Sequence, residues 1–95
     1  MARVTILSTP GGRPGDPDEI GDVEDSGLSF SQRRGQFGRG RLGAPGCNEL
    51  IGLLGADYME RPFHLVQGKR LLSNCRIVLS SGHIEFEYER EVTER

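Results

Sequence analysis

The feature that most constrains the fold is the segment His83 to Val92, HIEFEYEREV, in which apolar and polar residues alternate with a period of two. Successive side chains of a β-strand point to opposite faces of a sheet, so this alternation predicts a strand with one buried face and one solvated face. The expected buried face carries Ile84, Phe86, Tyr88 and Val92, and the expected solvated face carries Glu85, Glu87, Glu89 and Glu91.

A second strand is predicted directly before this one. Residues 70–79, RLLSNCRIVL, are rich in aliphatic side chains, and the separator Ser80-Ser81-Gly82 suits a tight turn. With Ser81 and Gly82 as the turn residues, the pairs across the strands are Leu79 with Ile84, Ile77 with Phe86, Cys75 with Tyr88, Arg76 with Glu87, and Val78 with Glu85. The apolar patterns of both strands agree in this one register, which predicts a β-hairpin.

A third strand is predicted over residues 63–67. Gly68 and Lys69 fit a type II′ turn with glycine first, which pairs Val66 with Leu71, Leu65 with Leu72, and His64 with Ser73. The result is an antiparallel meander of residues 63–67, 70–79 and 83–92. The segment RVTIL near the N-terminus, within residues 1–8, is a candidate fourth strand that would cover an edge of this sheet.

One short helix is predicted between residues 48 and 61. The segment NELIGLLGADYMER starts with Asn48, a capping residue, and is followed by Pro62. Its apolar stripe faces one way, and the opposite side carries Gly52, Gly55, Ala56 and Met59. Small residues allow another chain to approach closely, so Gly52, Ala56 and Met59 are candidate interface residues. The alternative is a short helix weakened by its glycines, or a broken loop.

Residues 9–46 are predicted to form a long, poorly ordered N-terminal arm. The stretch from Thr9 to Gly27 is rich in proline, glycine and acidic residues and has too few apolar side chains to hold itself together. An acidic block at 16–25 precedes a basic block at 33–41, and the two are expected to neutralise each other. The expected organisation is therefore an edge strand in 1–8, the arm in 9–46, and a helix with a β-meander in 47–95. The fold class is a small α+β domain with three to four antiparallel strands.

The basic block lies in SQRRGQFGRGR, residues 31–41. Arginine pairs with phosphates, glycine lets a backbone follow a single strand, and Phe30 or Phe37 would stack on a base. These features make residues 30–41 a candidate nucleic-acid-binding segment, with the candidate contacts Arg33, Arg34, Phe37, Arg39 and Arg41. The net charge of −2 opposes that interpretation, because an acidic chain repels a polyanion.

No sequence pattern points to catalysis or to a bound metal. Cys47, His64, Cys75 and His83 lack the closely spaced pairs that zinc modules use, and Ser81 has neither a nucleophile elbow nor a placed base. We therefore expect no enzyme activity, no cofactor, no metal and no small-molecule substrate. The two cysteines are expected to be small buried hydrophobic residues.

The longest apolar run is far shorter than the roughly 20 residues of a membrane span, and the N-terminal apolar stretch is shorter than the roughly 7 to 15 residues of a signal peptide. An intracellular protein, cytoplasmic, nuclear or virion-associated, is expected, without membrane contact.

Two functions follow as hypotheses. The preferred one is a small protein-binding or self-assembling module, such as a viral structural or accessory protein, that binds a protein partner or forms a homo-oligomer. In this hypothesis Glu85, Glu87 and Glu89 form either an acidic docking surface or simply a solvated sheet face. The alternative is binding of RNA or single-stranded nucleic acid through residues 30–41.

Overall fold

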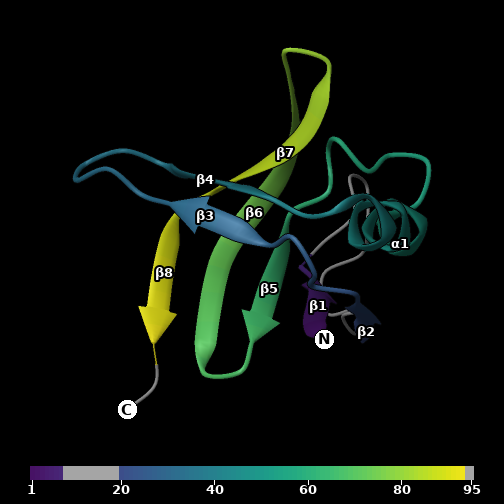
Figure 1. Ribbon diagram of the computed structural model, residues 1–95, viewed down its shortest axis with the longest axis horizontal. Helices are drawn as coiled ribbons and strands as arrows, with labels where there is room; N and C mark the ends of the chain where they lie inside the picture. The colour runs from purple at the N-terminus through teal and green to yellow at the C-terminus, as the bar shows by residue number, and fades with distance from the viewer. Residues whose placement is uncertain (8–19, 94–95) are drawn as a thin grey trace.

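The computed structural model describes residues 1–7 and 20–93. The described part contains one helix and eight strands, arranged as a mostly antiparallel sheet with α1 beside one end of it (Figure 1). The elements are β1 (Ala2–Ile6), β2 (Ile20–Val23), β3 (Ser29–Ser31), β4 (Gly38–Arg41), α1 (Ala44–Leu54), β5 (Phe63–Gln67), β6 (Arg70–Ser80), β7 (His83–Tyr88) and β8 (Arg90–Thr93). The predicted α+β class is confirmed, but the prediction of three to four strands is wrong.

The strands follow the order β2-β1-β5-β6-β7-β4-β3, and β8 also pairs with β6. The predicted hairpin between β6 and β7 is confirmed in its register for the pairs Arg76 with Glu87, Ile77 with Phe86, Val78 with Glu85, and Leu79 with Ile84. The ladder ends at Arg76, so the predicted pair of Cys75 with Tyr88 is not part of it. Ser81 and Gly82 both have positive φ, 52° and 79°, as a type I′ turn requires. The local sequence pattern thus sets the longest hairpin of the molecule.

The alternation of this hairpin does not extend to Val92. Glu89 separates β7 from β8, and Asn74 on β6 has a φ of 51°. Leu72 and Cys75 are both buried although they are three positions apart, so the side-chain direction changes within β6. Val92 pairs with Leu71 rather than with a core residue and is 42% exposed. The prediction that Val92 shares a buried face with Phe86 and Tyr88 is therefore wrong.

The pairing of β5 with β6 follows the prediction near the turn, where Val66 lies opposite Leu71 and Leu65 opposite Leu72. The prediction that His64 pairs with Ser73 is wrong, because a register shift between Phe63 and Leu65 brings Phe63 opposite Cys75. His64 is left beside the irregularity, and its Nδ1 accepts a hydrogen bond from the backbone N–H of Asn74 at 3.1 Å.

The N-terminal half takes part in the sheet. β1 pairs with β5 and so covers an edge of the meander as predicted, but it is not itself an edge strand, because β2 pairs with its other side. Within the predicted arm, residues 20–46 contain β2, β3, β4 and the start of α1, which contradicts a poorly ordered arm over that range. Residues 9–19 of the arm lie outside the described residues.

The helix also differs from its prediction. α1 begins at Ala44, with Gly43 as its N-cap and Pro45 in its first turn, where a missing N–H group does no harm. It ends at Leu54, because Gly55 adopts a φ of 86° as the C-cap. Ala56 and Met59 therefore lie in the turns after the helix, and the predicted helical face of small residues does not form.

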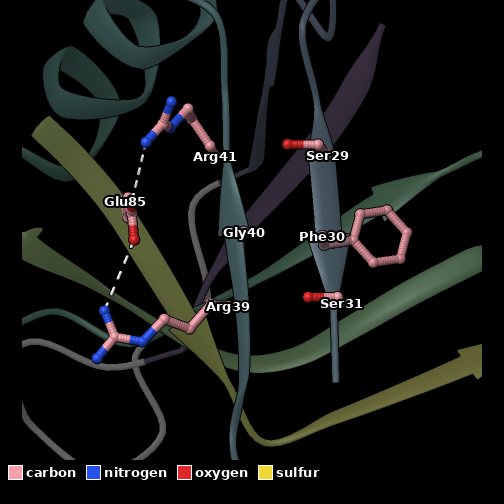
Figure 2. Close-up of a pocket in the computed structure, with 7 residues that line it drawn as sticks. All are labelled: Ser29, Phe30, Ser31, Arg39, Gly40, Arg41 and Glu85. Carbon is pink, nitrogen blue, oxygen red and sulfur yellow. Dashed lines mark hydrogen bonds and ion pairs between the residues drawn. The ribbon is translucent and has the colours of Figure 1, made fainter. Parts of the chain in front are cut away.

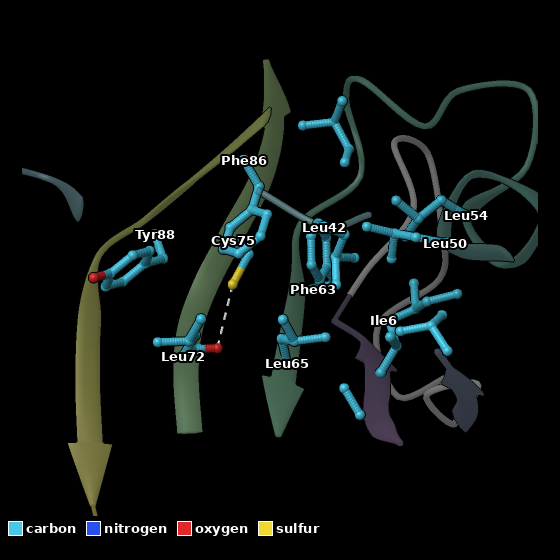
Figure 3. Close-up of a cluster of buried hydrophobic side chains, with 14 residues drawn as sticks. Ile6, Leu42, Leu50, Leu54, Phe63, Leu65, Leu72, Cys75, Phe86 and Tyr88 are labelled. Atoms are coloured by element: carbon cyan, nitrogen blue, oxygen red, sulfur yellow. Dashed lines mark hydrogen bonds between the residues drawn. The ribbon is translucent and has the colours of Figure 1, made fainter. Parts of the chain in front are cut away.

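The hydrophobic core runs along the sheet from Tyr88 on β7 to Leu50 and Leu54 on α1 (Figure 3). The rings of Phe63 and Phe86 meet edge to face, with their centroids 6.3 Å apart. Cys75 is fully buried, and burial raises the pKa of its thiol to about 12. Cys47 is only partly buried, and both cysteines are free thiols. Within residues 1–7 and 20–93, no helix is long and apolar enough to cross a membrane.

Candidate interaction site on the β3–β4 hairpin

The glycines of β4 are packing positions. Gly38 lies opposite Tyr88 and Gly40 opposite Phe86, on the neighbouring strand β7. A Cβ atom added at either glycine would overlap the aromatic ring across from it, and both rings are buried. The large rings thus fill the space that the two glycines leave empty, which joins β4 to the core. This part of the basic segment is a strand of the sheet and not a flexible tract.

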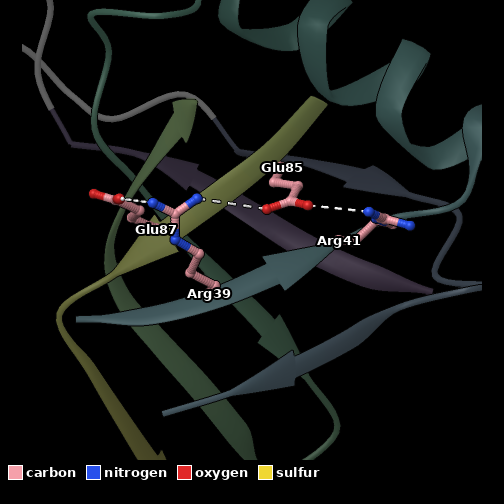
Figure 4. A network of polar contacts seen from close by, with 4 residues as sticks. All are labelled: Arg39, Arg41, Glu85 and Glu87. Atoms are coloured by element: carbon pink, nitrogen blue, oxygen red, sulfur yellow. Dashed lines mark hydrogen bonds and ion pairs between the residues drawn. The ribbon is translucent and has the colours of Figure 1, made fainter. Parts of the chain in front are cut away.

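The arginines that alternate with these glycines point to the outer face, where they meet the glutamates of β7 (Figure 4). Arg39 Nη2 lies 3.0 Å from Glu87 Oε1, and Arg39 Nη1 lies 3.6 Å from Glu85 Oε2. Arg41 Nη2 lies 3.0 Å from Glu85 Oε1. The hydrogen bond from Arg41 is the main cause that lowers the pKa of Glu85 below its ordinary value. Arg39 and Arg41, which were candidate nucleic-acid contacts, therefore neutralise Glu85 and Glu87. Both glutamates were candidate residues of an acidic docking surface.

The acidic block before β3 has other contacts. Asp25 accepts a hydrogen bond from Gln67 Nε2 at 2.9 Å, which lowers the pKa of Asp25, and lies 3.5 Å from the N-terminal amine. The backbone N–H of Glu24 donates to Glu49. The expectation that this block neutralises the basic one is wrong for Glu24 and Asp25. The acidic residues at 16–19 lie outside the described residues.

The remaining candidate contacts, Arg33, Arg34 and Phe37, lie in the loop that joins β3 to β4, here called the hairpin tip (residues 32–37). Gln32 holds this loop: its Nε2 donates to the carbonyl oxygens of Gln36 at 3.2 Å and Glu89 at 2.9 Å. Phe37 is 65% exposed. Both arginines are exposed, and in the described part of the chain neither forms an ion pair. The sequence analysis missed Gln32, because one glutamine in a loop gives no pattern.

Phe30 points to the opposite side of β3 from Ser29 and Ser31 (Figure 2). Its ring meets Tyr88 edge to face at 6.1 Å, and the guanidinium carbon of Arg70 lies 5.6 Å from the ring centroid. A cation over an aromatic face is attracted to it, so Arg70 helps hold the ring in place. Since both neighbours occupy this ring, Phe37 is the aromatic residue of the segment that is free to contact a ligand.

A shallow groove of about 360 Å³ runs over the outer face of β3 and β4 (Figure 2). Ser29 and Ser31 border it from β3, and their side chains point to the opposite side of the strand from Phe30. Arg39, Arg41 and Glu85 border it from the other side. The groove therefore presents hydroxyl groups next to arginines whose charge is already balanced.

The other predicted interface residues lie on different elements. Glu89 stands between β7 and β8, and its Oε2 accepts a hydrogen bond from Asn74 Nδ2 at 2.9 Å. Gly52 lies on α1, and a Cβ atom added there would meet no atom within 4 Å. Ala56 and Met59 lie in the turns after the helix; Ala56 is exposed, and Met59 is 44% exposed. The six predicted interface residues thus come from α1, the turns after it, β7 and the junction between β7 and β8.

Within residues 1–7 and 20–93, no group of three or more histidine, cysteine, aspartate or glutamate side chains is placed to hold a metal ion. The fold and the hairpin define a small antiparallel β-protein with one helix and a fixed, exposed hairpin tip. Comparison with protein families, curated proteins and solved structures finds no match to this chain.

Proposed function

We propose that this chain is a non-enzymatic module that binds protein, and that its partner is a second copy of itself. One observation carries the proposal: the arginines of β4 pair with the glutamates of β7, whereas nothing in the described part of the chain covers the uncharged edge of β3 or the ring of Phe37. Exposed aromatic residues and arginines are enriched at protein interfaces, and a free strand edge is a template for another chain.

The hairpin tip supports this proposal because its conformation is already fixed. Gln32 bonds to Gln36 on the far side of the loop and to Glu89 on the adjacent strand connection. A loop that is ordered before binding loses less conformational entropy when a partner docks. The backbone that carries the arginines of the tip and Phe37 is therefore held in place before a partner binds.

Size-exclusion chromatography with light scattering tests the proposal, over a range of protein concentrations and at low and high salt. We expect a multiple of the 10.5 kDa chain mass that persists at high salt, with an absorbance ratio typical of protein alone. Persistence is expected because backbone pairing and apolar contacts are screened less than surface charges. A mass of 10.5 kDa at every concentration contradicts the proposal.

The alternative is binding of single-stranded nucleic acid at the hairpin tip. It is favoured by the exposure of Arg33 and Arg34 beside the exposed ring of Phe37, which would stack on a base for about 1–3 kcal/mol. Two phosphate contacts imply that the affinity falls only about 2.6-fold for each doubling of salt.

Fluorescence anisotropy with a labelled oligouridylate tests this alternative. Arg33→Gln with Arg34→Gln abolishes binding if the tip holds the nucleic acid. Arg39→Gln with Arg41→Gln is the matched control, since those side chains already bond to Glu85 and Glu87. Equal binding by both double variants argues against the hairpin tip as the site.

A further inference from the structure

Among residues 1–7 and 20–93, three strands pair on one side only along their length: β2, β3 and β8. Edge strands usually carry charges, prolines or a covering element, because these block pairing with other chains. β8 carries Arg90 and Glu91. β2 carries Asp22, and the side chain of Leu53 on α1 lies against its Gly21.

The edge of β3 lacks these protections. Its sequence is Ser29-Phe30-Ser31, without charge or proline. In the described part of the chain, residues 29–31 pair with β4 alone, and no backbone hydrogen bond outside that pairing involves them. Residues 76–80 of β6 pair only with β7 in the described part of the chain, so their other side is also an edge. That edge carries the charged Arg76. The backbone of β3 is thus the edge best suited to receive another strand.

The charges on either side of β3 select the direction of that strand. The acidic Glu24 precedes β3, and Arg33 and Arg34 follow it, whereas Asp25 already lies beside the N-terminal amine. If a second copy adds in the antiparallel direction, the basic end of each β3 lies beside the acidic end of the other. Parallel addition would bring like charges together. Complementary charges at two symmetric places favour an isologous dimer with a two-fold axis.

Building on the proposed function, we propose that two copies of this chain pair antiparallel through the free edges of β3, with the two-fold axis at Phe30. In this register Ser29 of each copy lies opposite Ser31 of the other, and all three residues of β3 are paired. A shift by one residue would place Phe30 opposite a serine and mix the inner and outer faces of the sheet. The grooves over Ser29 and Ser31 (Figure 2) then join across the axis.

Disulfide cross-linking tests this register in a Cys47→Ser background, which removes the partly buried thiol. Cys75 is buried with a pKa of about 12 and does not compete. Ser29→Cys and Ser31→Cys are made in separate chains, one of them tagged, and the two are mixed under mild oxidation. Directly opposed residues of antiparallel strands have Cα atoms about 4.5–5.5 Å apart, within the range of a disulfide.

We expect several-fold more cross-linked dimer from the mixture than from either variant alone. Two copies of the same variant carry their cysteines about 6.8 Å apart along the strands, in addition to the spacing between strands, and so lie outside disulfide range. Equal yields from the mixture and from the single variants overturn the register.

Edge blocking gives an independent measurement. Ser29→Lys with Ser31→Lys puts charges on the outer face of β3, and light scattering is expected to show the mass falling to that of one chain. Thr93→Lys places a lysine on the β8 edge as a matched control and is expected to leave the mass unchanged. Thermal unfolding of each variant establishes that it is folded.

The outcomes separate the two proposals. If the unmodified chain is an oligomer, but the lysine variant keeps the same mass and no mixed disulfide forms, pairing through β3 is overturned and the protein-binding function stands. If the unmodified chain has the mass of one chain at every concentration, both proposals are overturned.

Discussion

The two halves of the basic segment carry two arginines each but have different structures. In β4, arginines alternate with glycines, and Arg39 and Arg41 bond to the glutamates of β7. In the hairpin tip, Arg33 and Arg34 point to solvent beside the exposed Phe37. Residue type alone therefore does not make an arginine available to a partner. What decides is whether a strand with opposite charges lies next to it.

The end of β7 explains where the two halves divide. β4 pairs with β7 from Gly40 opposite Phe86 to Gly38 opposite Tyr88, and the regular strand stops there. The next glutamate, Glu89, bonds to Asn74 and supplies its carbonyl to Gln32. The hairpin tip therefore extends past the last glutamate that faces β4, and its arginines find no partner on β7.

The largest expected effect comes from the glycines of β4. Gly40→Ala places a methyl group where the ring of Phe86 lies, and overpacking of a buried site destabilises by about 1–3 kcal/mol. Gly52→Ala makes the same chemical change on α1, where nothing lies within 4 Å of the added atom. We expect that variant to stabilise the chain by up to about 1 kcal/mol, because alanine favours a helix.

Urea denaturation of both alanine variants checks this prediction. Opposite shifts of the unfolding midpoint are expected. If Gly40→Ala is as stable as the unmodified chain, β4 does not pack against Phe86, and the distinction between the two halves of the basic segment is lost.

The sequence predicts the β6–β7 hairpin because the pattern that encodes it is local and apolar. The β6–β7 hairpin is encoded by apolar residues with a period of two and by Ser81-Gly82 at the turn, so its register was predicted correctly. β4 has the same period, but its inner positions are Gly38 and Gly40, which give no hydrophobic signal. The rings that fill those positions belong to β7, far along the chain, so composition alone suggested a disordered arm.

The candidate site shows the same division. The sequence indicates two separate candidate sites, a nucleic-acid-binding segment with Arg39 and Arg41 and an acidic surface with Glu85 and Glu87. In the structure the two pairs contact each other. Their contact depends on β4 lying beside β7, which is a property of strand order and not of local sequence. The end of α1 was missed for a local reason: Gly55 stops the helix before the residues that were predicted to continue it.

Double substitutions distinguish the ion-paired arginines of β4 from the exposed arginines of the hairpin tip. Arg39→Gln with Arg41→Gln removes the contacts to Glu85 and Glu87, and we expect a lower urea midpoint, with a difference that shrinks at high salt because salt screens exposed ion pairs. Arg33→Gln with Arg34→Gln is expected to stay within about 0.5 kcal/mol of the unmodified chain. An equal loss in both variants would show that the tip arginines also stabilise the fold.

The pH dependence isolates the contribution of Glu85. Arg41 and Arg39 hold its pKa in the folded chain below the ordinary value of 4.5. Its stabilising contribution is therefore present above pH 4.5 and is lost as the pH falls below that value. Glu85→Gln is expected to unfold at lower urea concentration than the unmodified chain at neutral pH, and the two curves should converge in acid. A difference that is the same at neutral and acidic pH would contradict this origin of the stability.

The smallest expected effect on stability belongs to Phe37. Its ring is 65% exposed and lies outside the hydrophobic core, so Phe37→Ser is expected to change the free energy of unfolding by less than about 0.5 kcal/mol. The same variant is expected to weaken self-association, measured by light scattering at rising protein concentration, because an aromatic ring at an interface buries a large apolar area. A change in association without a change in stability would assign Phe37 to contacts outside its own chain. Loss of stability would instead place the hairpin tip with β4, as part of the folded framework.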